Sequence, residues 1–200
     1  MNEKFFDLKT EKQDRMINAS LKIFAKNGYQ YASTDEIVKE ASISKGLLFH
    51  YFGSKLGLYV FLADYAVRYM KMEIMNALDE KEKDYFVILK TVETARMATL
   101  KKFPFMQMFL YAMEQEADTE ARKATKEQRA NLKTLYQEMM KKADYSGFRT
   151  VAEPERIEKL IEMTLKSLMK ENMRGGTFKR GEYHIEALKY IEMLGALVKK

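Results

Sequence analysis

The sequence predicts an all-α protein of about nine helices, and three observations support this fold class. Two prolines and nine glycines among 200 residues leave few positions where a helix must stop. Strong helix formers recur at helical spacing, for example over residues 154–162, and no segment has a convincing strand pattern. Short helices with tight turns give way near residue 70 to long helices rich in methionine. This change predicts a small head over 9–69 and a larger helical bundle over 70–200.

The expected helices of the head cover 10–27, 34–41, 45–51 and a segment from near 54 into the seventies. Thr10 and Gln13 have the spacing of a capping box at the start of the first helix, and Gly28 is placed to end it. Ser33 and Ser44 can cap the next two helices, because a serine oxygen accepts a hydrogen bond from a free backbone N–H. The expected helices of the bundle cover 84–103 (stopped by Pro104), 105–117, 119–143, 154–174 (followed by Gly175–Gly176) and 182–198.

The composition excludes several classes of protein. No cysteine is present, which excludes disulfides, thiolate metal sites and a cysteine nucleophile. His50 and His184 lie far apart, without the neighbours that a metal site or a catalytic triad requires. We therefore expect neither cofactor nor metal, and an all-helical enzyme is the weaker alternative. The net charge of +6 permits a polyanionic partner, although a lysine-rich solvated surface is the commoner cause of such an excess.

The chain is expected to be cytoplasmic and to have no membrane partner. Its first residues carry acids where a signal peptide needs a basic start and an apolar run. The longest apolar stretch, 103–113, is shorter than the roughly 18 residues that a spanning helix needs.

Residues 33–52 have the pattern of a helix-turn-helix motif. The link 42–44 between two short helices has the length that lets the second helix cross the first steeply. One shared core is predicted for Ile37, Val38, Ala41, Ile43, Leu48 and Phe52. The exposed remainder of the second helix combines a cation, a glycine and aromatic tips, which can contact phosphates and base edges in a major groove. The alternative, favoured for the aromatic residues taken alone, is that they belong to the core of a helical bundle.

At these residues the sequence resembles the TetR family of bacterial transcriptional repressors. The similarity covers about residues 10–60, and it is strongest in S-K-G-x-L-F-x-Y-F-x-S-K at 44–55. The resemblance implies an N-terminal DNA-binding head, a helical domain that dimerises and holds a small effector, and a palindromic operator. The positions that it assigns to DNA binding are Thr34, Ser44, Lys45, Gly46, Leu47, Phe49, His50, Tyr51 and Lys55. Leu47 and Phe49 stand where the family commonly has hydroxyl-bearing residues, and Ser42 stands where it often has glycine.

Two further sites are expected in the body. Soft and aromatic side chains predict a pocket for an apolar effector; the alternative is that these side chains only pack the protein core. The candidates are Met70, Met97, Phe105, Met108, Phe109, Tyr111, Met139 and His184. Apolar stripes on the last two helices suit a homodimer interface, unless they face only their own core; the candidates are Ile157, Ile161, Thr164, Leu165, Leu168, Leu188, Ile191, Gly195 and Val198.

The predicted function is therefore a homodimeric repressor of a palindromic operator, released by a small and mostly hydrophobic effector. The main alternative is a helical DNA-binding protein that needs no effector. Residues 1–60 contain nine bases and seven acids, so the DNA-binding prediction rests on a few placed groups and not on the overall charge.

Overall fold

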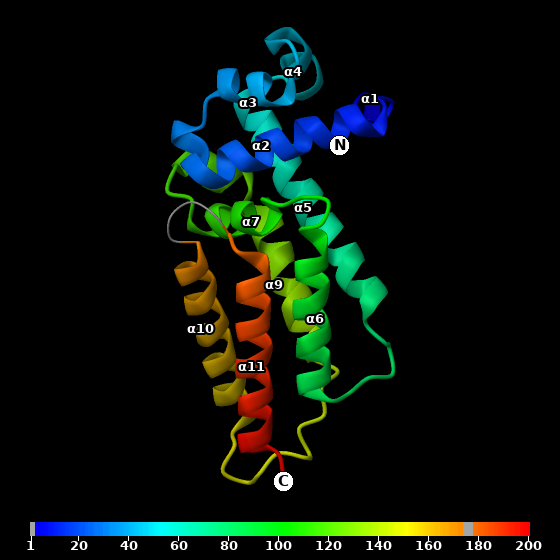
Figure 1. Ribbon diagram of the computed structural model, residues 1–200, viewed down its shortest axis with the longest axis vertical. Coiled ribbons are helices and arrows are strands. Elements are labelled where there is room, and N and C mark those ends of the chain that lie inside the picture. The colour runs from blue at the N-terminus through cyan, green and yellow to red at the C-terminus, as the bar shows by residue number, and fades with distance from the viewer. Residues whose placement is uncertain (1–2, 174–177) are drawn as a thin grey trace. The chain divides into compact units, whose positions relative to one another are not determined.

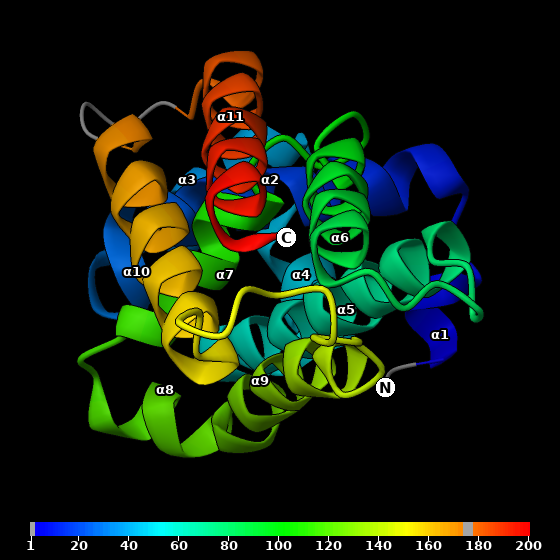
Figure 2. The same cartoon turned by 90° about the horizontal axis from the view of Figure 1, so that it is seen from below.

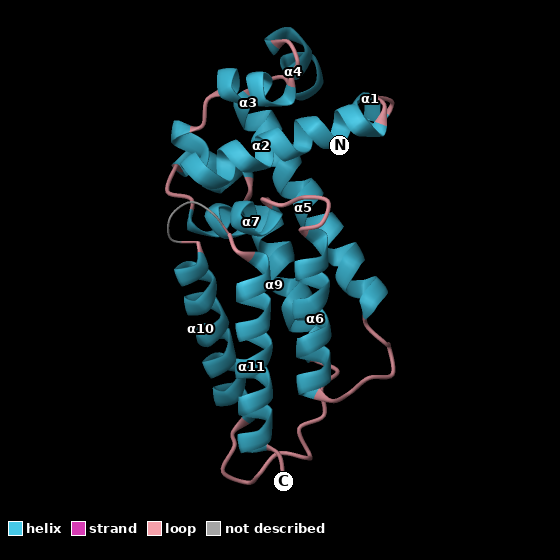
Figure 3. Ribbon diagram, in the orientation of Figure 1, coloured by secondary structure: helices cyan, strands magenta, loops and turns pink. Residues whose placement is uncertain are grey.

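The computed structural model describes residues 3–173 and 178–200, and over these residues the predicted all-α fold is confirmed (Figure 3). The helices are α1 (Glu3–Phe6), α2 (Thr10–Tyr31), α3 (Thr34–Ala41), α4 (Lys45–Phe52), α5 (Lys55–Ala77), α6 (Tyr85–Thr99), α7 (Met106–Gln115), α8 (Thr119–Ala124), α9 (Lys126–Met140), α10 (Pro154–Asn172) and α11 (Arg180–Val198). The predicted glycine stop at 175–176 lies outside the described residues.

Several helix ends agree with their predicted causes and others do not. Ser33 and Ser44 cap α3 and α4 as expected. The predicted capping box at Thr10 is wrong, because α2 is preceded by Lys9 without a side-chain cap. Gln13 instead donates from Nε2 to the carbonyl oxygens of Phe6, at 3.0 Å, and Leu8, at 2.7 Å, which ties α2 to the segment before it.

Two predicted helices differ in detail from those observed. The single helix expected over 119–143 is two helices, α8 and α9, with Thr125 between them. The Thr125 hydroxyl is buried and donates to the carbonyl of Ala121, so the side chain competes for helix hydrogen bonds at the break. In α2 the helical assignment continues past Gly28, but this glycine has φ 66° and ψ −178°, so a kink stands where the helix was predicted to end. A left-handed φ of this kind favours glycine.

Contacts within the chain separate two compact units, residues 1–70 with 99–133 and residues 71–98 with 134–200. In the first unit α2 contacts α3 and α7, and α3 contacts α4 (Figure 1). Apolar residues on one face of α2, among them Met16, Leu21 and Phe24, are buried in its core. This division follows packing, so the separation of functions at residue 69/70 stays a prediction.

The second unit contains the C-terminal parts of α5 and α9, nearly all of α6, and α10 and α11. Figure 2 shows α10 and α11 side by side, and these two helices are in contact. Ile161, Leu165 and Met169 of α10 and Ala187 and Ile191 of α11 are buried. Among the described helices no single one is long and apolar enough to cross a membrane; α4 and α5, bent by 63°, pass that test only as a pair and only by length and composition.

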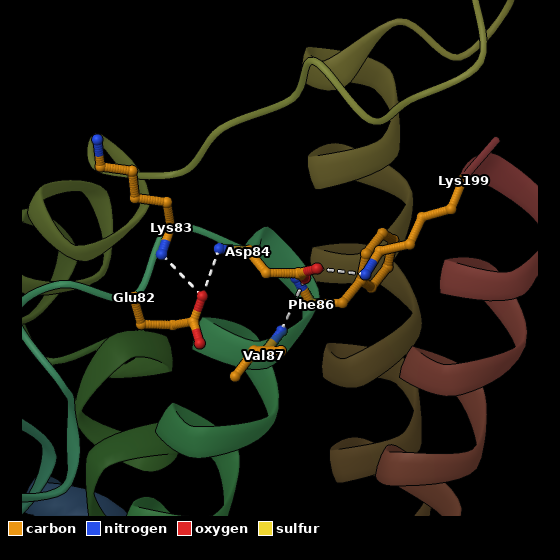
Figure 4. A network of polar contacts seen from close by, with 6 residues as sticks. All are labelled: Glu82, Lys83, Asp84, Phe86, Val87 and Lys199. Atoms are coloured by element: carbon orange, nitrogen blue, oxygen red, sulfur yellow. Dashed lines mark hydrogen bonds and ion pairs between the residues drawn. The ribbon is translucent and has the colours of Figure 1, made fainter.

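Asp84 fixes the start of α6 (Figure 4). Its Oδ1 accepts hydrogen bonds from the backbone N–H groups of Phe86, at 2.9 Å, and Val87, at 3.2 Å. Its Oδ2 pairs with the ammonium of Lys199 near the end of the chain. Partial burial raises the pKa of Asp84, but the hydrogen bonds from Lys199, Val87 and Phe86 outweigh it and hold the pKa below the ordinary value.

Candidate nucleic-acid interface

The turn between α3 and α4 sets the angle of the helix-turn-helix motif. The N–H of Ser42 donates to the carbonyl of Lys39, and the N–H of Ile43 donates to the carbonyl of Val38, as in a Schellman motif. Ser42 is in the left-handed region, at φ 53° and ψ 52°. A β-carbon is strained in this conformation, so a serine here costs more than the glycine that often fills such a position.

The start of α4 is capped and then exposes its side chains. Ser44 Oγ accepts a hydrogen bond from the N–H of Leu47 at 3.2 Å. Leu48 and Phe52 are buried, as the predicted shared core requires. Lys45, Gly46 and His50 are exposed, whereas Leu47, Phe49 and Tyr51 are half-buried. The His50 and Tyr51 rings meet edge to face, with centroids 5.0 Å apart. The outer face of α4 therefore presents one cation, one residue without a side chain and one imidazole.

Lys45 carries that cation, and a carboxylate of the neighbouring helix partly neutralises it. Its Nζ lies 2.9 Å from Oδ1 and 3.1 Å from Oδ2 of Asp35, in the first turn of α3. The Lys45 and Asp35 side chains are 50% and 71% exposed. Lys45 is predicted from the sequence and its partner Asp35 is not, although Asp35 is an acid ten positions before an exposed lysine, across a tight turn.

Lys55, at the start of α5, donates its side-chain hydrogen bonds to backbone carbonyl groups of the protein itself. Its Nζ donates to the carbonyls of Gln30 and Ala32, each at 3.1 Å, and lies 4.6 Å from the centroid of the Tyr29 ring. These carbonyls belong to the end of α2, where a cation also interacts favourably with the helix dipole. The contacts give Lys55 a structural role in joining α5 to α2.

The turn from α4 to α5 depends on a close approach of two backbones. A β-carbon added at Gly57 would lie 2.0 Å from the carbonyl oxygen of Phe52, which no side chain could accommodate. The Phe52 carbonyl also accepts from the N–H of Ser54 at 2.8 Å across Gly53, which has φ 71°. Gly57 therefore lets α5 start against the end of α4.

Aromatic side chains pack against the buried side of α4. Phe5 of α1 is fully buried, and its ring centroid lies 5.2 Å from that of Phe52 and 5.0 Å from that of Phe61 on α5. The edge of the same ring meets Tyr51, with the centroids 5.9 Å apart. The predicted head starts at residue 9 and therefore omits Phe5. The sequence feature that could have indicated the burial of Phe5 is a pair of phenylalanines in an otherwise charged N-terminal segment.

A buried carboxylate joins three helices of the first unit. Glu116, directly after α7, accepts hydrogen bonds from the N–H of Tyr29, at 2.8 Å, and the hydroxyl of Tyr59, at 3.4 Å. Burial, followed by the charge of Glu116, raises the pKa of Tyr59, so this hydroxyl stays a donor. Gly28 lies against Glu116 Oε2, which would be 3.6 Å from a β-carbon there. The kink in α2 thus brings an N–H to the carboxylate.

The residues predicted to form the effector pocket are found in both units. Phe109 is fully buried and packs on Phe24 and Tyr59, with centroids 6.5 Å and 5.5 Å away. Met70, Phe105, Met108 and Tyr111 also belong to the first unit, and Met97, Met139 and His184 belong to the second. The role of these eight residues in binding an effector stays a prediction.

The residues predicted to form the dimer interface are mostly covered by the chain itself. Ile161, Leu165, Ile191, Gly195 and Val198 are buried, and Ile157, Thr164, Leu168 and Leu188 are half-buried. Other large apolar side chains of the same two helices are exposed: Leu160, Met163, Ile185, Tyr190, Met193 and Leu197. We call these six residues the apolar face of α10 and α11.

Residues 16–60 match the sequence profile of the bacterial regulatory proteins of the tetR family. Two uncharacterized HTH-type transcriptional regulators of Bacillus subtilis strain 168 are similar in sequence to a part of this chain. YuxN is 44% identical over 55 residues, which is 28% of this chain and 19% of YuxN. YerO is 36% identical over 70 residues, which is 35% of this chain and 24% of YerO. The matched part of the chain thus spans about a fifth to a quarter of the length of these relatives.

Solved structures share the fold over nearly the whole chain. A TetR family transcriptional regulator from Chloroflexus aurantiacus J-10-fl superposes with a TM-score of 0.65 at 17% identity, covering 99% of this chain and 98% of that one. The fatty acid degradation regulator FadR from Bacillus halodurans gives a TM-score of 0.67 at 18% identity, covering 91% of this chain and 97% of that one. Residues 16–60 are thus similar to the tetR family in sequence, and nearly the whole chain is similar to these solved structures in fold.

Proposed function

Because the chain belongs to the TetR family of bacterial transcriptional regulators, we propose that it is a homodimeric repressor of a palindromic operator, released by a small, mostly hydrophobic effector. In this proposal residues 9–69 bind DNA, and residues 70–200 hold the effector and join the two copies. The outer face of α4 carries the proposal, because it presents Lys45, Gly46 and His50 from a helix that is capped and firmly supported.

The proposed DNA contacts follow from the chemistry of each group. Thr34 and Ser44 stand at the N-termini of α3 and α4, where free N–H groups and the helix dipole favour phosphate. Lys45 can donate to guanine O6 and N7, and Gly46 leaves room for a base edge to approach. His50 and Tyr51 reach bases or phosphate from the next turn. Leu47 and Phe49 offer apolar contact, for example with a thymine methyl group.

Lys55 supports the interface by a different route in this proposal. Two of its three N–H groups are engaged by the carbonyls of Gln30 and Ala32, which leaves one for a phosphate. Its main contribution is then to hold α5, and with it α4, against the end of α2.

The apolar face of α10 and α11 supports the proposed dimer. Large apolar side chains clustered on a surface are typical of an interaction site. Two copies are also needed to place two recognition helices in successive major grooves, about 34 Å apart along the duplex. The predicted residues at the margins of this face, Ile157, Thr164 and Leu168, remain available to contribute.

Selection of bound sequences from random duplex DNA tests the head and the dimer together. We expect an inverted repeat, and we expect Lys45→Ala to weaken its binding by roughly tenfold to a hundredfold, the loss of about 1–3 kcal/mol expected for a base contact. Lys71→Ala is the matched control, since Lys71 is an exposed lysine of α5 outside the head. A K45A variant that binds as tightly and selectively as the parent would show that α4 is not the recognition surface. Binding that no apolar compound alters would favour the effector-free alternative.

A further inference from the structure

One large aromatic side chain of the head faces solvent. Tyr31, the last residue of α2, is 78% exposed, although Tyr29 and Ala32 beside it are buried. Among the described residues its side chain has no hydrogen bond and no ring contact. A ring that stays in water buries little apolar surface, so it adds little to the stability of the fold. Exposed tyrosines of this kind are typical of surfaces that meet a partner, because the ring offers apolar area and the hydroxyl a hydrogen bond.

The backbone that carries Tyr31 is held on both sides. Lys55 Nζ donates to the carbonyls of Gln30 and Ala32, the two neighbours of Tyr31, each at 3.1 Å. The same ammonium lies 4.6 Å from the centroid of the buried Tyr29 ring. With its backbone fixed, Tyr31 has only its two side-chain torsions left to order when it binds, which keeps the entropic cost of a contact low.

This fixed segment leads directly into the helix-turn-helix motif. Asp35, in the first turn of α3, pairs with Lys45 of α4 at 2.9 Å, so the first turns of the two helices lie together. Tyr31 precedes Thr34 by three residues, so their Cα atoms are at most about 11 Å apart. In helix-turn-helix proteins the second helix lies in the major groove and the first crosses the DNA backbone. The segment that enters α3 is therefore next to the sugar-phosphate backbone when α4 is in the groove.

We infer that Tyr31 is a further DNA contact, whose hydroxyl donates to a backbone phosphate while its ring packs on the adjoining deoxyribose. A phosphate oxygen is a charged acceptor, which strengthens such a hydrogen bond, and tyrosine is among the side chains that contact phosphates in DNA complexes. Lys55 is then a positioning residue, because it holds the carbonyls on both sides of Tyr31. The inference rests on the proposed function, since it adds a contact to the same DNA-binding surface.

The Tyr31 contact differs from the one proposed for Lys45 in two measurable ways. A phosphate contact carries no base information, so its loss weakens binding to the operator and to a scrambled duplex by the same factor. The phenol is also neutral and releases no counterion, so the slope of log affinity against log salt stays that of the parent. Loss of the Lys45 cation should instead reduce both the preference for the operator and the salt slope.

The test is Tyr31→Phe in the full chain, which keeps the ring and removes the hydroxyl. Fluorescence anisotropy should show binding about tenfold weaker to both the selected operator and a scrambled duplex, the loss of one hydrogen bond in each of two copies. Tyr136→Phe, which removes a hydroxyl from α9 outside the head, is the control. Replacing single operator phosphates by neutral methylphosphonates locates the partner, because one replacement should weaken binding of the parent and leave binding of the Y31F variant unchanged.

A second variant tests the positioning role, and the outcomes separate this inference from the proposed function. Lys55→Met removes the hydrogen bonds to the two carbonyls, so in that background Tyr31→Phe should change affinity by less than about threefold; fully additive effects would remove the positioning role of Lys55. If the parent selects an inverted repeat but Y31F binds like the parent, the Tyr31 contact fails and the proposed function stands. A loss confined to the operator would show base reading and overturn the phosphate contact. A parent that binds no duplex overturns both.

Discussion

At the scale of single residues, the exposed positions of α4 could be predicted, but their partners could not. Ser44, Leu48 and Phe52 lie where the motif predicts them, because capping and burial follow from helical spacing. The ion pair from Lys45 to Asp35 depends on the angle between two helices, which the turn geometry sets. The same holds for Lys55, whose carbonyl partners are at the far end of α2.

Asp35 should restrain binding to non-specific DNA. Its carboxylate repels phosphate and competes for the Lys45 ammonium, so Asp35→Asn should raise affinity for a scrambled duplex by about threefold to tenfold and steepen the salt dependence. Affinity for the selected operator should rise less, so that specificity falls. Fluorescence anisotropy at several salt concentrations measures both, with Asp79→Asn, at an exposed acid outside the head, as the control. A D35N variant with unchanged affinity for both duplexes would remove this role.

Ser42 should be replaceable by glycine with a gain in stability. The left-handed conformation costs a residue with a side chain roughly 1–2 kcal/mol of stability, which glycine avoids. The greater conformational entropy of glycine in the unfolded chain offsets about half of this gain. We expect Ser42→Gly to be more stable by about 0.5–1 kcal/mol, measured from the urea midpoint. Ser167→Gly, inside α10, should lose about 0.5 kcal/mol, because its backbone is helical. Loss of stability in S42G would contradict the strain assigned to the turn.

At the scale of elements, helix ends with a local cause were predictable and those with a distant cause were not. Ser33, Ser44 and Gly28 act on their own neighbours, and the structure has a cap or a kink at each. The short helix α1 depends on what packs around it. Phe5 is buried only because Phe52 and Phe61 meet it from two other helices.

Asp84 should stabilise the start of α6 in two separable ways. Asp84→Asn keeps an oxygen for the N–H groups of Phe86 and Val87 but loses the charge that attracts Lys199, whereas Asp84→Ala loses both. We expect the alanine variant to be less stable by about 1 kcal/mol, with the asparagine variant between it and the parent. Thermal unfolding at neutral pH measures this difference.

The contribution of the Asp84 charge should also depend on pH. Because folding lowers the pKa of this carboxyl from 3.8, the stabilisation is complete above that unfolded-state value and disappears as the pH falls through the folded-state value. The stability difference between the parent and D84N should therefore be constant near neutrality and shrink below pH 3.8. A difference that grew on acidification would contradict the sign of the shift.

At the scale of the whole molecule, apolar periodicity marks α10 and α11 as the helices of the proposed dimer but does not separate their two faces. The stripe containing Ile161, Leu165 and Ile191 is covered within one chain. Both stripes of a helix can be apolar, and spacing alone does not say which one meets the protein's own core. The apolar face of α10 and α11 is therefore the better candidate for the interface.

A charge on this face should separate the copies. We expect Leu197→Glu combined with Met193→Glu to weaken dimerisation by at least about a hundredfold, since two carboxylates would be buried without partners. Sedimentation velocity at micromolar concentration measures the association state. Met75→Glu is the control, because Met75 is an equally exposed methionine on α5. If the double variant sediments like the parent, these residues lie outside the interface.

The backbone contact at Gly57 also affects how new DNA specificity can arise. The orientation of α4 against α5 depends on the close approach of main-chain atoms of Phe52 and Gly57. Because Lys45, Gly46 and His50 are exposed, substitutions there can change the proposed DNA-reading surface and leave this backbone contact intact. Evolution or a designer can vary the reading surface one residue at a time, provided that position 57 stays glycine.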